Sequence, residues 1–118
     1  MTKTSCISSA NATRLINLRN KESYTKYIGR QRGHNHHYGN PFIIGVHGSR
    51  NEVIRMFDFW IQGVAYTNVE SRRREWILQN LASLEGEILA CWCHPLPCHG
   101  DVYIQILKEM KEGKCIKV

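Results

Sequence analysis

The best-supported element in the pattern of apolar and polar positions is a helix that begins after Ser49. Ser49 and Glu52 have the spacing of a capping box, in which each side chain accepts a hydrogen bond from a backbone N–H of the other residue. Gly63 is a natural end for this helix. Between these residues the pattern predicts one buried stripe, made of Val53, Ile54, Phe57, Trp60 and Ile61.

Two more helices are predicted from the same kind of pattern. One runs from about Ser71 to Leu84, with Gly86 as a stop after it. The other begins near Asp101, a residue type that caps helices well, and ends at Gly113. The apolar stripes are Trp76, Ile77, Leu81 and Leu84 in the first, and Val102, Ile106, Leu107 and Met110 in the second. We expect the stripe that follows Ser49 and the stripe of this last helix both to pack on a sheet that contains Ile88 to Trp92.

Four short stretches favour β-strands. The clearest is Glu87 to Cys93, which is predicted as the central strand because it is apolar on both faces, as buried parallel strands usually are. Weaker ones are Arg14 to Leu18, Thr25 to Ile28 and Phe42 to Gly45. This order of elements predicts an α/β fold, a small single-layer and mostly parallel sheet flanked by about three helices, similar to a Rossmann fold.

Length and composition fit a single domain over residues 1–118. The chain is 42% hydrophobic and 22% charged, which is typical of a globular domain. No apolar run approaches the roughly 18 residues of a membrane span. Residues 1–12 are polar, which predicts a frayed terminus and no secretory signal. We therefore expect a cytoplasmic protein without membrane contact, and its five cysteines, an odd number, argue against a closed disulfide framework.

The net charge of +6 favours polyanionic partners, such as nucleic acid or phosphorylated ligands. Much of this charge lies in the run Arg72-Arg73-Arg74 and in the lysines of the last eleven residues. A solvated helix face explains such charges equally well. Nucleic-acid binding therefore stays open as an alternative.

Reactive side chains are concentrated between Cys91 and Asp101, where a strand would end and a helix would begin. Ligands of open α/β sheets bind at such places. The N–H groups at a helix start attract anions and favour the thiolate form of a cysteine. Cys98 as nucleophile, His99 as acid or base and Asp101 are the candidate catalytic residues, and Gly100 would let the backbone approach a ligand. Alternatively, Cys98 packs under the helix and Asp101 only caps it.

The same cysteines allow a second interpretation, a metal site. Cys91 and Cys93 would share one face of a strand, and with Cys98 and His99 they could hold zinc tetrahedrally. Cys-x-Cys on one strand is less typical of zinc than Cys-x-x-Cys. We therefore predict no metal and no cofactor, with a zinc-stabilised module as the alternative. The histidines of the polar loop, His34, His36 and His37, are expected to be solvated.

A second group of candidates lies in the loop before the first helix. The guanidinium of Arg30 suits phosphate or carboxylate, and Asn40 offers both a donor and an acceptor. An ordinary surface loop would account for both residues equally well. The predicted ligand-binding residues are Arg30, Asn40, Cys93 and Gly100.

Two blocks of sequence resemble a known family. Tyr27-Ile28-Gly29-Arg30 with Gly39-Asn40-Pro41-Phe42 forms one block, and Leu89 to Cys93 with Pro95 to Asp101 forms the other. Together they are similar to domain-of-unknown-function family 4326, small proteins of bacteria and their phages, over residues 27–107. The stretch Gln31 to Tyr38 is longer here than the family pattern and carries histidines. The resemblance implies no particular activity, but it does imply that the two blocks meet at one site.

These features predict a protein that binds a small phosphate-bearing, nucleotide-like ligand. Arg30 and Asn40 would face the anion or base, and the loop from Cys98 to Asp101 would cradle the phosphate. A transferase or hydrolase reaction on that ligand is compatible with the same residues. Two alternatives come from other classes: a zinc-stabilised Cys/His module, and a basic accessory protein that binds nucleic acid or another protein.

Overall fold

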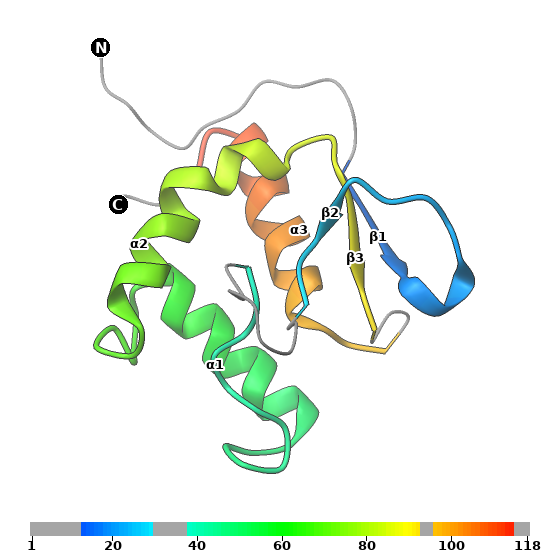
Figure 1. Cartoon of the computed structure of the whole chain (residues 1–118). Coiled ribbons are helices and arrows are strands. Elements are labelled where there is room, and N and C mark those ends of the chain that lie inside the picture. Colours follow the sequence, from blue (N-terminus) through cyan, green and yellow to red (C-terminus); the bar gives the residue numbers. More distant parts are fainter. Residues whose placement is uncertain (1–12, 30–37, 93–95, 115–118) are drawn as a thin grey trace.

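The strands form one small parallel sheet, which confirms the predicted fold class (Figure 1). The computed structural model describes residues 13–29, 38–92 and 96–114. Within these ranges the sheet has three strands: β1 is Arg14–Asn17, β2 is Lys26–Tyr27 and β3 is Ile88–Cys91. Their order is β1-β3-β2, so the apolar strand predicted as the central one does lie in the centre.

Three α-helices complete the fold close to their predicted positions. Helix α1 is Arg50–Gln62 and ends at Gly63, whose positive φ of 78° suits glycine. Helix α2 is Ser71–Asn80 and continues as the 3-10 helix η2, Leu81–Leu84. Helix α3 is His99–Lys111.

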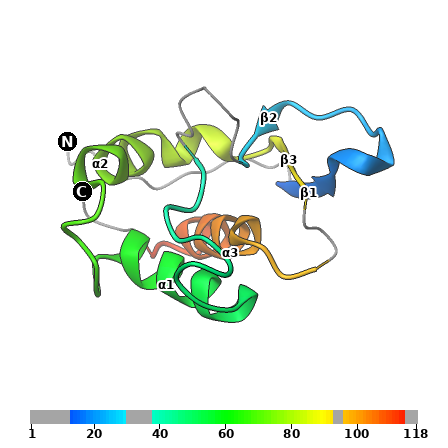
Figure 2. The same ribbon diagram turned by 60° about the horizontal axis from the view of Figure 1, so that its bottom comes forward.

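Helix α3 lies between the strands and α1 (Figure 2). Helix α3 packs on β1, and α1 packs mainly on α3 and α2. We expected the stripes of α1 and α3 both to lie on the sheet, so this expectation was wrong for α1. Its large side chains fill the space between helices instead: Phe57, Trp60 and Ile61 are fully buried there.

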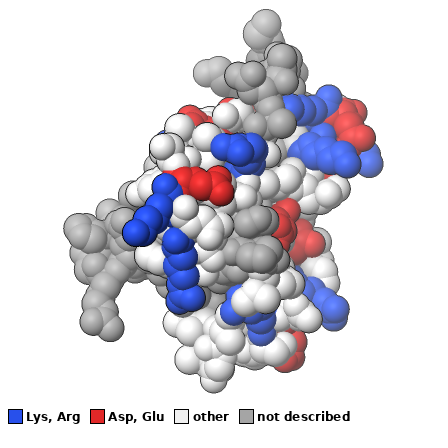
Figure 3. Space-filling model, turned by 90° about the vertical axis from the view of Figure 1, so that its right-hand side faces the viewer, with Lys and Arg blue, Asp and Glu red and all other residues white. Residues whose placement is uncertain are grey.

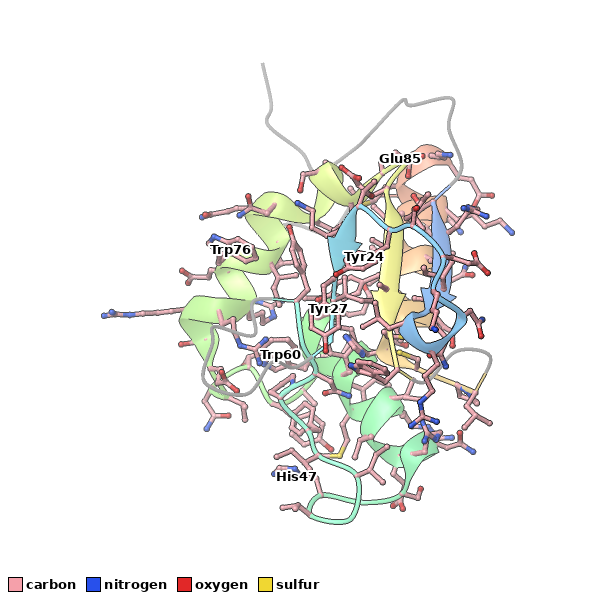
Figure 4. The ribbon with its side chains drawn as sticks, turned by 45° about the vertical axis from the view of Figure 1, so that its right-hand side comes forward. Tyr24, Tyr27, His47, Trp60, Trp76 and Glu85 are labelled. Atoms are coloured by element: carbon pink, nitrogen blue, oxygen red, sulfur yellow. The ribbon has the colours of Figure 1, made fainter. Side chains whose placement is uncertain are left out.

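The predicted strand from Phe42 to Gly45 was also wrong. Asn40 begins a turn, because its Oδ1 accepts the N–H of Phe42 at 2.9 Å. A second turn follows, in which the Ile43 N–H donates to Nδ1 of His47 at 2.8 Å (Figure 4). Only Phe42 of the apolar run is buried, and Ile43 and Ile44 are exposed. The run is therefore a loop that leads into α1.

Two arginines of the basic run are used inside the fold. Arg73 donates to the Gly39 carbonyl oxygen at 2.6 Å and pairs with Glu70. Arg74 donates to the carbonyl oxygen of Trp60 at 2.7 Å, near the end of α1. On the face shown in Figure 3, basic and acidic side chains lie interspersed. Arg73 and Arg74 thus have partners within the fold, so their positive charges do not require a polyanionic ligand. Within the described ranges, no helix is long and apolar enough to cross a membrane.

Candidate functional site

The two blocks of the family pattern meet where the strands end and α3 begins. Nε2 of His99 lies 2.8 Å from the carbonyl oxygen of Ile28, which follows β2. One turn further along α3, the Tyr103 hydroxyl donates to the carbonyl oxygen of Tyr38 at 2.8 Å. Burial raises the pKa of Tyr103 well above its ordinary value, so this hydroxyl keeps its proton. The segments before α1 are thus tied to α3 by hydrogen bonds.

Cys98, and not Asp101, is the N-cap of α3. The Sγ of Cys98 accepts the N–H of Gly100 at 3.3 Å, and Oδ2 of Asp101 accepts the N–H of Cys98 at 3.0 Å. Together these bonds form a capping box. The sequence prediction placed the helix start about three residues too late, because it treated Asp101 as the cap. A cysteine is a weak acceptor and gives no capping signal of its own.

The contacts of its ring hold His99 in one orientation, with a hydrogen on Nε2. A carbonyl oxygen can only accept, so Nε2 must carry the hydrogen that bonds to Ile28. This leaves Nδ1 to face the Sγ of Cys98, 3.5 Å away. The rings of Phe57 and Tyr103 contact the imidazole edge-on, with centroids 5.3 and 5.8 Å from it. Nδ1 of His99 is therefore placed to accept a hydrogen bond from the thiol of Cys98.

Cys98 and His99 also line a small surface pocket of about 60 Å³. Since a water molecule needs roughly 10–15 Å³ of such space, the pocket has room for a group the size of a single phosphate or carboxylate. Two other polar residues, Asn40 and Arg50, complete its polar lining. The apolar part of the lining consists of Phe42, Ile44, Val53, Ile54 and Pro97.

Arg50 is the candidate site residue that sequence reasoning missed. It is the first residue of α1, and its Nη1 donates to the Pro97 carbonyl oxygen at 3.2 Å. A guanidinium has five N–H donors, so this bond leaves others for a ligand. Among the described residues that line the pocket, Arg50 is the only charged one. The capping box predicted where α1 begins, but not that α1 and α3 begin beside the same pocket.

Asn40 and Gly100 both have clear roles in the fold. The Nδ2 of buried Asn40 donates to the carbonyl oxygen of Val53 at 3.0 Å, which ties the turn to α1. A Cβ on Gly100 would lie 2.7 Å from Cδ1 of Leu15 and 2.9 Å from Cδ1 of Ile28. Gly100 therefore lets α3 approach the strands. Asn40 in addition lines the pocket, and the ligand-binding roles of both residues stay predictions.

Of the remaining predicted residues, the structure describes only Asp101, which does not line the pocket. Asp101 is exposed and lines a neighbouring groove between α1 and α3, together with Asp58 and Glu109. It contacts Cys98 through the backbone, as a cap, and does not line the pocket. Arg30 and Cys93 lie outside the described residues, as do the histidines of the loop. The ligand-binding roles of Arg30 and Cys93 stay predictions.

The described residues offer no ready-made metal site. Within residues 13–29, 38–92 and 96–114, no group of three or more His, Cys, Asp or Glu side chains could hold a metal ion. Cys91 and Cys98 are both buried. The zinc alternative depends on Cys93, which lies outside these ranges, together with Cys91, Cys98 and His99.

The chain belongs to the family described as domain of unknown function, DUF4326. The family model matches residues 14–109, from the first strand to the last turns of α3. This range includes Cys98, His99, Asn40 and Arg50. No curated protein and no solved structure matches the chain. A function must therefore be argued from the geometry of the site.

Proposed function

We propose that this protein binds a small phosphate-bearing ligand in the pocket formed where α1 and α3 begin. The observation that carries the proposal is the electrostatic character of the pocket. Two helix N-termini flank it, each with a partial positive charge, and Arg50, whose guanidinium donates to the Pro97 carbonyl oxygen, is among its lining residues. The carboxylates of Glu52 and Asp101 cap these helices and do not line it. An anion is the complementary ligand.

Arg50 supplies the main contact in this proposal. The amides at the start of α3 are already engaged, since Gly100 donates to Sγ of Cys98 and Asp101 donates to the carbonyl oxygen of Cys98. The guanidinium, in contrast, has donors left and a fork that suits phosphate oxygens. Arg30 and Cys93 are proposed to contact the part of the ligand outside the pocket.

The size of the pocket limits how the ligand is bound. About 60 Å³ accommodates a phosphate group but not a base and a sugar as well. A nucleotide-like ligand would place its phosphate in the pocket and the rest on the surface beside it. The buried, hydrogen-bonded Asn40 holds the rim of the pocket in shape for this ligand.

Binding can be tested with a panel of inorganic phosphate, nucleoside monophosphates and sugar phosphates, with the uncharged nucleosides as controls. A ligand that binds the folded state raises the melting temperature. We expect Arg50→Gln to weaken binding by about 1.5–3 kcal/mol, the scale of a charged hydrogen bond, and Arg30→Ala to have a similar effect. Arg55→Gln removes the same charge from an exposed position of α1 and should change affinity little.

Two results would count against the proposal. If no phosphate compound shifts the melting curve or gives heat in calorimetry, phosphate is the wrong ligand. If Arg55→Gln weakens binding as much as Arg50→Gln, the effect comes from net charge and not from the pocket.

The zinc-stabilised module remains the second candidate, because Cys98 and His99 are adjacent thiol and imidazole ligand types. Elemental analysis separates the two. We expect less than stoichiometric zinc in the purified protein, and about one zinc per chain that is lost on Cys98→Ser would favour the module.

A further inference from the structure

The Cys98 thiol is positioned in a way that its role as a cap does not explain. Serine, threonine and aspartate cap helices well, whereas a thiol is a poor hydrogen-bond acceptor. Cys98 nevertheless caps α3, and its residue is only 2% exposed. Its Sγ receives the Gly100 N–H at 3.3 Å and faces Nδ1 of His99 at 3.5 Å. The Gly100 N–H favours a negative charge on sulfur, and Nδ1 of His99 is a base within reach of the thiol proton.

The position of the proton follows from the hydrogen bonds of His99. Because Nε2 carries a hydrogen for the Ile28 carbonyl, Nδ1 is the nitrogen that can take the thiol proton. The product would be a thiolate beside an imidazolium, the arrangement that activates cysteine nucleophiles. Three other described titratable groups lie near this pair. The positive charge of Arg50, which lines the same pocket, favours the thiolate. The carboxylate of Asp101 accepts the backbone N–H of Cys98, and the ring of Tyr103 contacts the His99 imidazole.

We propose that Cys98 is a nucleophile, activated by His99, that forms a covalent bond to an electrophilic carbon of the small anionic ligand held by Arg50. This inference rests on the proposed function, since it uses the same pocket. Cys98, His99 and Arg50 all belong to the lining of that pocket, so a ligand whose anionic group lies against Arg50 is within reach of the thiol.

The step is a substitution at carbon. The thiol proton moves to Nδ1 of His99, and Sγ uses an electron pair to form the S–C bond. The bond between carbon and the leaving group breaks, and its electron pair departs with the leaving group. The imidazolium then gives its proton to the leaving group or to water. No oxidant or reductant is needed.

Iodoacetate and iodoacetamide form a matched pair of probes for this step. Both transfer a two-carbon unit to sulfur and release iodide, but only iodoacetate is an anion. The rates are measured at about pH 7, where a free thiol is only a few per cent thiolate. Peptide mapping by mass spectrometry assigns the label to each cysteine. Glutathione provides the ratio of the two rates for a free thiol.

We expect Cys98 to react at least about tenfold faster than the same residue in the chain unfolded by urea. We also expect its preference for iodoacetate over iodoacetamide to exceed that of glutathione by about tenfold, because a pocket cation worth about 1.4 kcal/mol changes a rate by that factor. Arg50→Gln should remove this preference and leave the reaction with iodoacetamide nearly unchanged. Arg55→Gln should leave both rates unchanged.

Two variants test the roles of His99 and Cys98 without removing their structural contacts. In His99→Gln the amide nitrogen can still donate to Ile28, but no base faces the thiol, so the Cys98 rate should fall by tenfold or more. Cys98→Ser keeps a helix cap and must lose the labelled peptide. Circular dichroism shows whether each variant is folded.

The outcomes separate the two proposals. A Cys98 that reacts no faster in the folded chain than in the unfolded one, or equally fast in His99→Gln, overturns the nucleophile. A fast Cys98 without preference for iodoacetate supports the nucleophile but contradicts an anion pocket. Phosphate binding without selective alkylation leaves the proposed function standing and removes the covalent step.

Discussion

The starts of α1 and α3 have the same local structure but are built from different residues. Both are closed by a capping box, and both place their first helical side chain in the lining of one pocket. The α1 cap is exposed, whereas the α3 cap is buried against the strands. From the cap to the third helical position, the residues are Ser49, Arg50, Asn51 and Glu52 in α1, and Cys98, His99, Gly100 and Asp101 in α3.

This comparison separates what folding requires from what it leaves unexplained. Ser49 caps α1 with a good acceptor, and Glu52 returns a hydrogen bond, so stability alone accounts for them. Gly100 is also explained, since any larger residue would meet Leu15 and Ile28. A cysteine cap beside a histidine is not explained by stability. That residue pair is where the two helix starts differ in chemistry.

The first prediction concerns Trp60, a fully buried side chain of α1, and leaves the Ser49 cap unchanged. Trp60 is fully buried, and its Nε1 donates to the Val69 carbonyl oxygen at 2.8 Å. Trp60→Ala should lower the free energy of unfolding by about 3–5 kcal/mol, because a large cavity and an unpaired carbonyl remain. Denaturant melts measure this loss. A loss under about 1 kcal/mol would contradict the burial of the ring.

The second prediction compares the second helical position of each start. Gly100→Ala places a Cβ 2.7 Å from a Leu15 methyl group, so α3 must shift away from β1. We expect a loss of about 1–3 kcal/mol. Asn51→Ala at the exposed matching position should stay within about 0.5 kcal/mol of the wild type. Equal effects of the two changes would mean that α3 does not pack so closely.

The third prediction concerns the two caps. Ser49→Ala should cost about 1 kcal/mol, since the N–H of Glu52 loses its acceptor. Cys98→Ser should cost less than that or stabilise the chain, because a hydroxyl is the better cap for Gly100. The comparison uses urea melts of both variants at one pH. A large loss in Cys98→Ser would show that the thiol is needed for packing.

The smallest expected effect is the pH dependence of the α1 cap. The hydrogen bond from the backbone N–H of Ser49 lowers the pKa of Glu52 below 4.5. A lowered pKa in the folded state means that the stabilisation is present above the ordinary value of 4.5 and is lost as the pH falls through the folded value. The stability difference between wild type and Glu52→Gln should therefore shrink on acidification. A difference that is constant between roughly pH 3 and pH 7 would exclude this role.

Much of the fold could be predicted because its signals are local. Ser49, Glu52 and Gly63 predict α1 at both ends, and the doubly apolar β3 indicates the centre of the sheet. The run from Phe42 to Gly45 was predicted as a strand because it is apolar. It lies outside the sheet of the described residues, which only the tertiary structure reveals. The packing of α1 on α3 is likewise a long-range property.

The candidate site was predicted in part, because some of its signals are also local in the sequence. Cys98 and His99 are adjacent in sequence and lie at a strand-to-helix junction, so their motif could be recognised. Arg50 is 48 residues away from Cys98 and looks like an ordinary first residue of a helix. Asp101 was grouped with Cys98 and His99 as a catalytic candidate, with a purely capping role as the alternative. The structure uses that carboxylate for the cap.

The most direct test of a shared anion site is a titration of the isotope-labelled protein with inorganic phosphate, followed by NMR at constant ionic strength. If α1 and α3 begin at one site, the backbone amides of residues 49–52 and 98–101 should shift together with a single dissociation constant. Arg50→Gln should weaken both sets of shifts equally, and Arg55→Gln should leave them unchanged. Shifts confined to one helix start, or two different dissociation constants, would contradict the shared site.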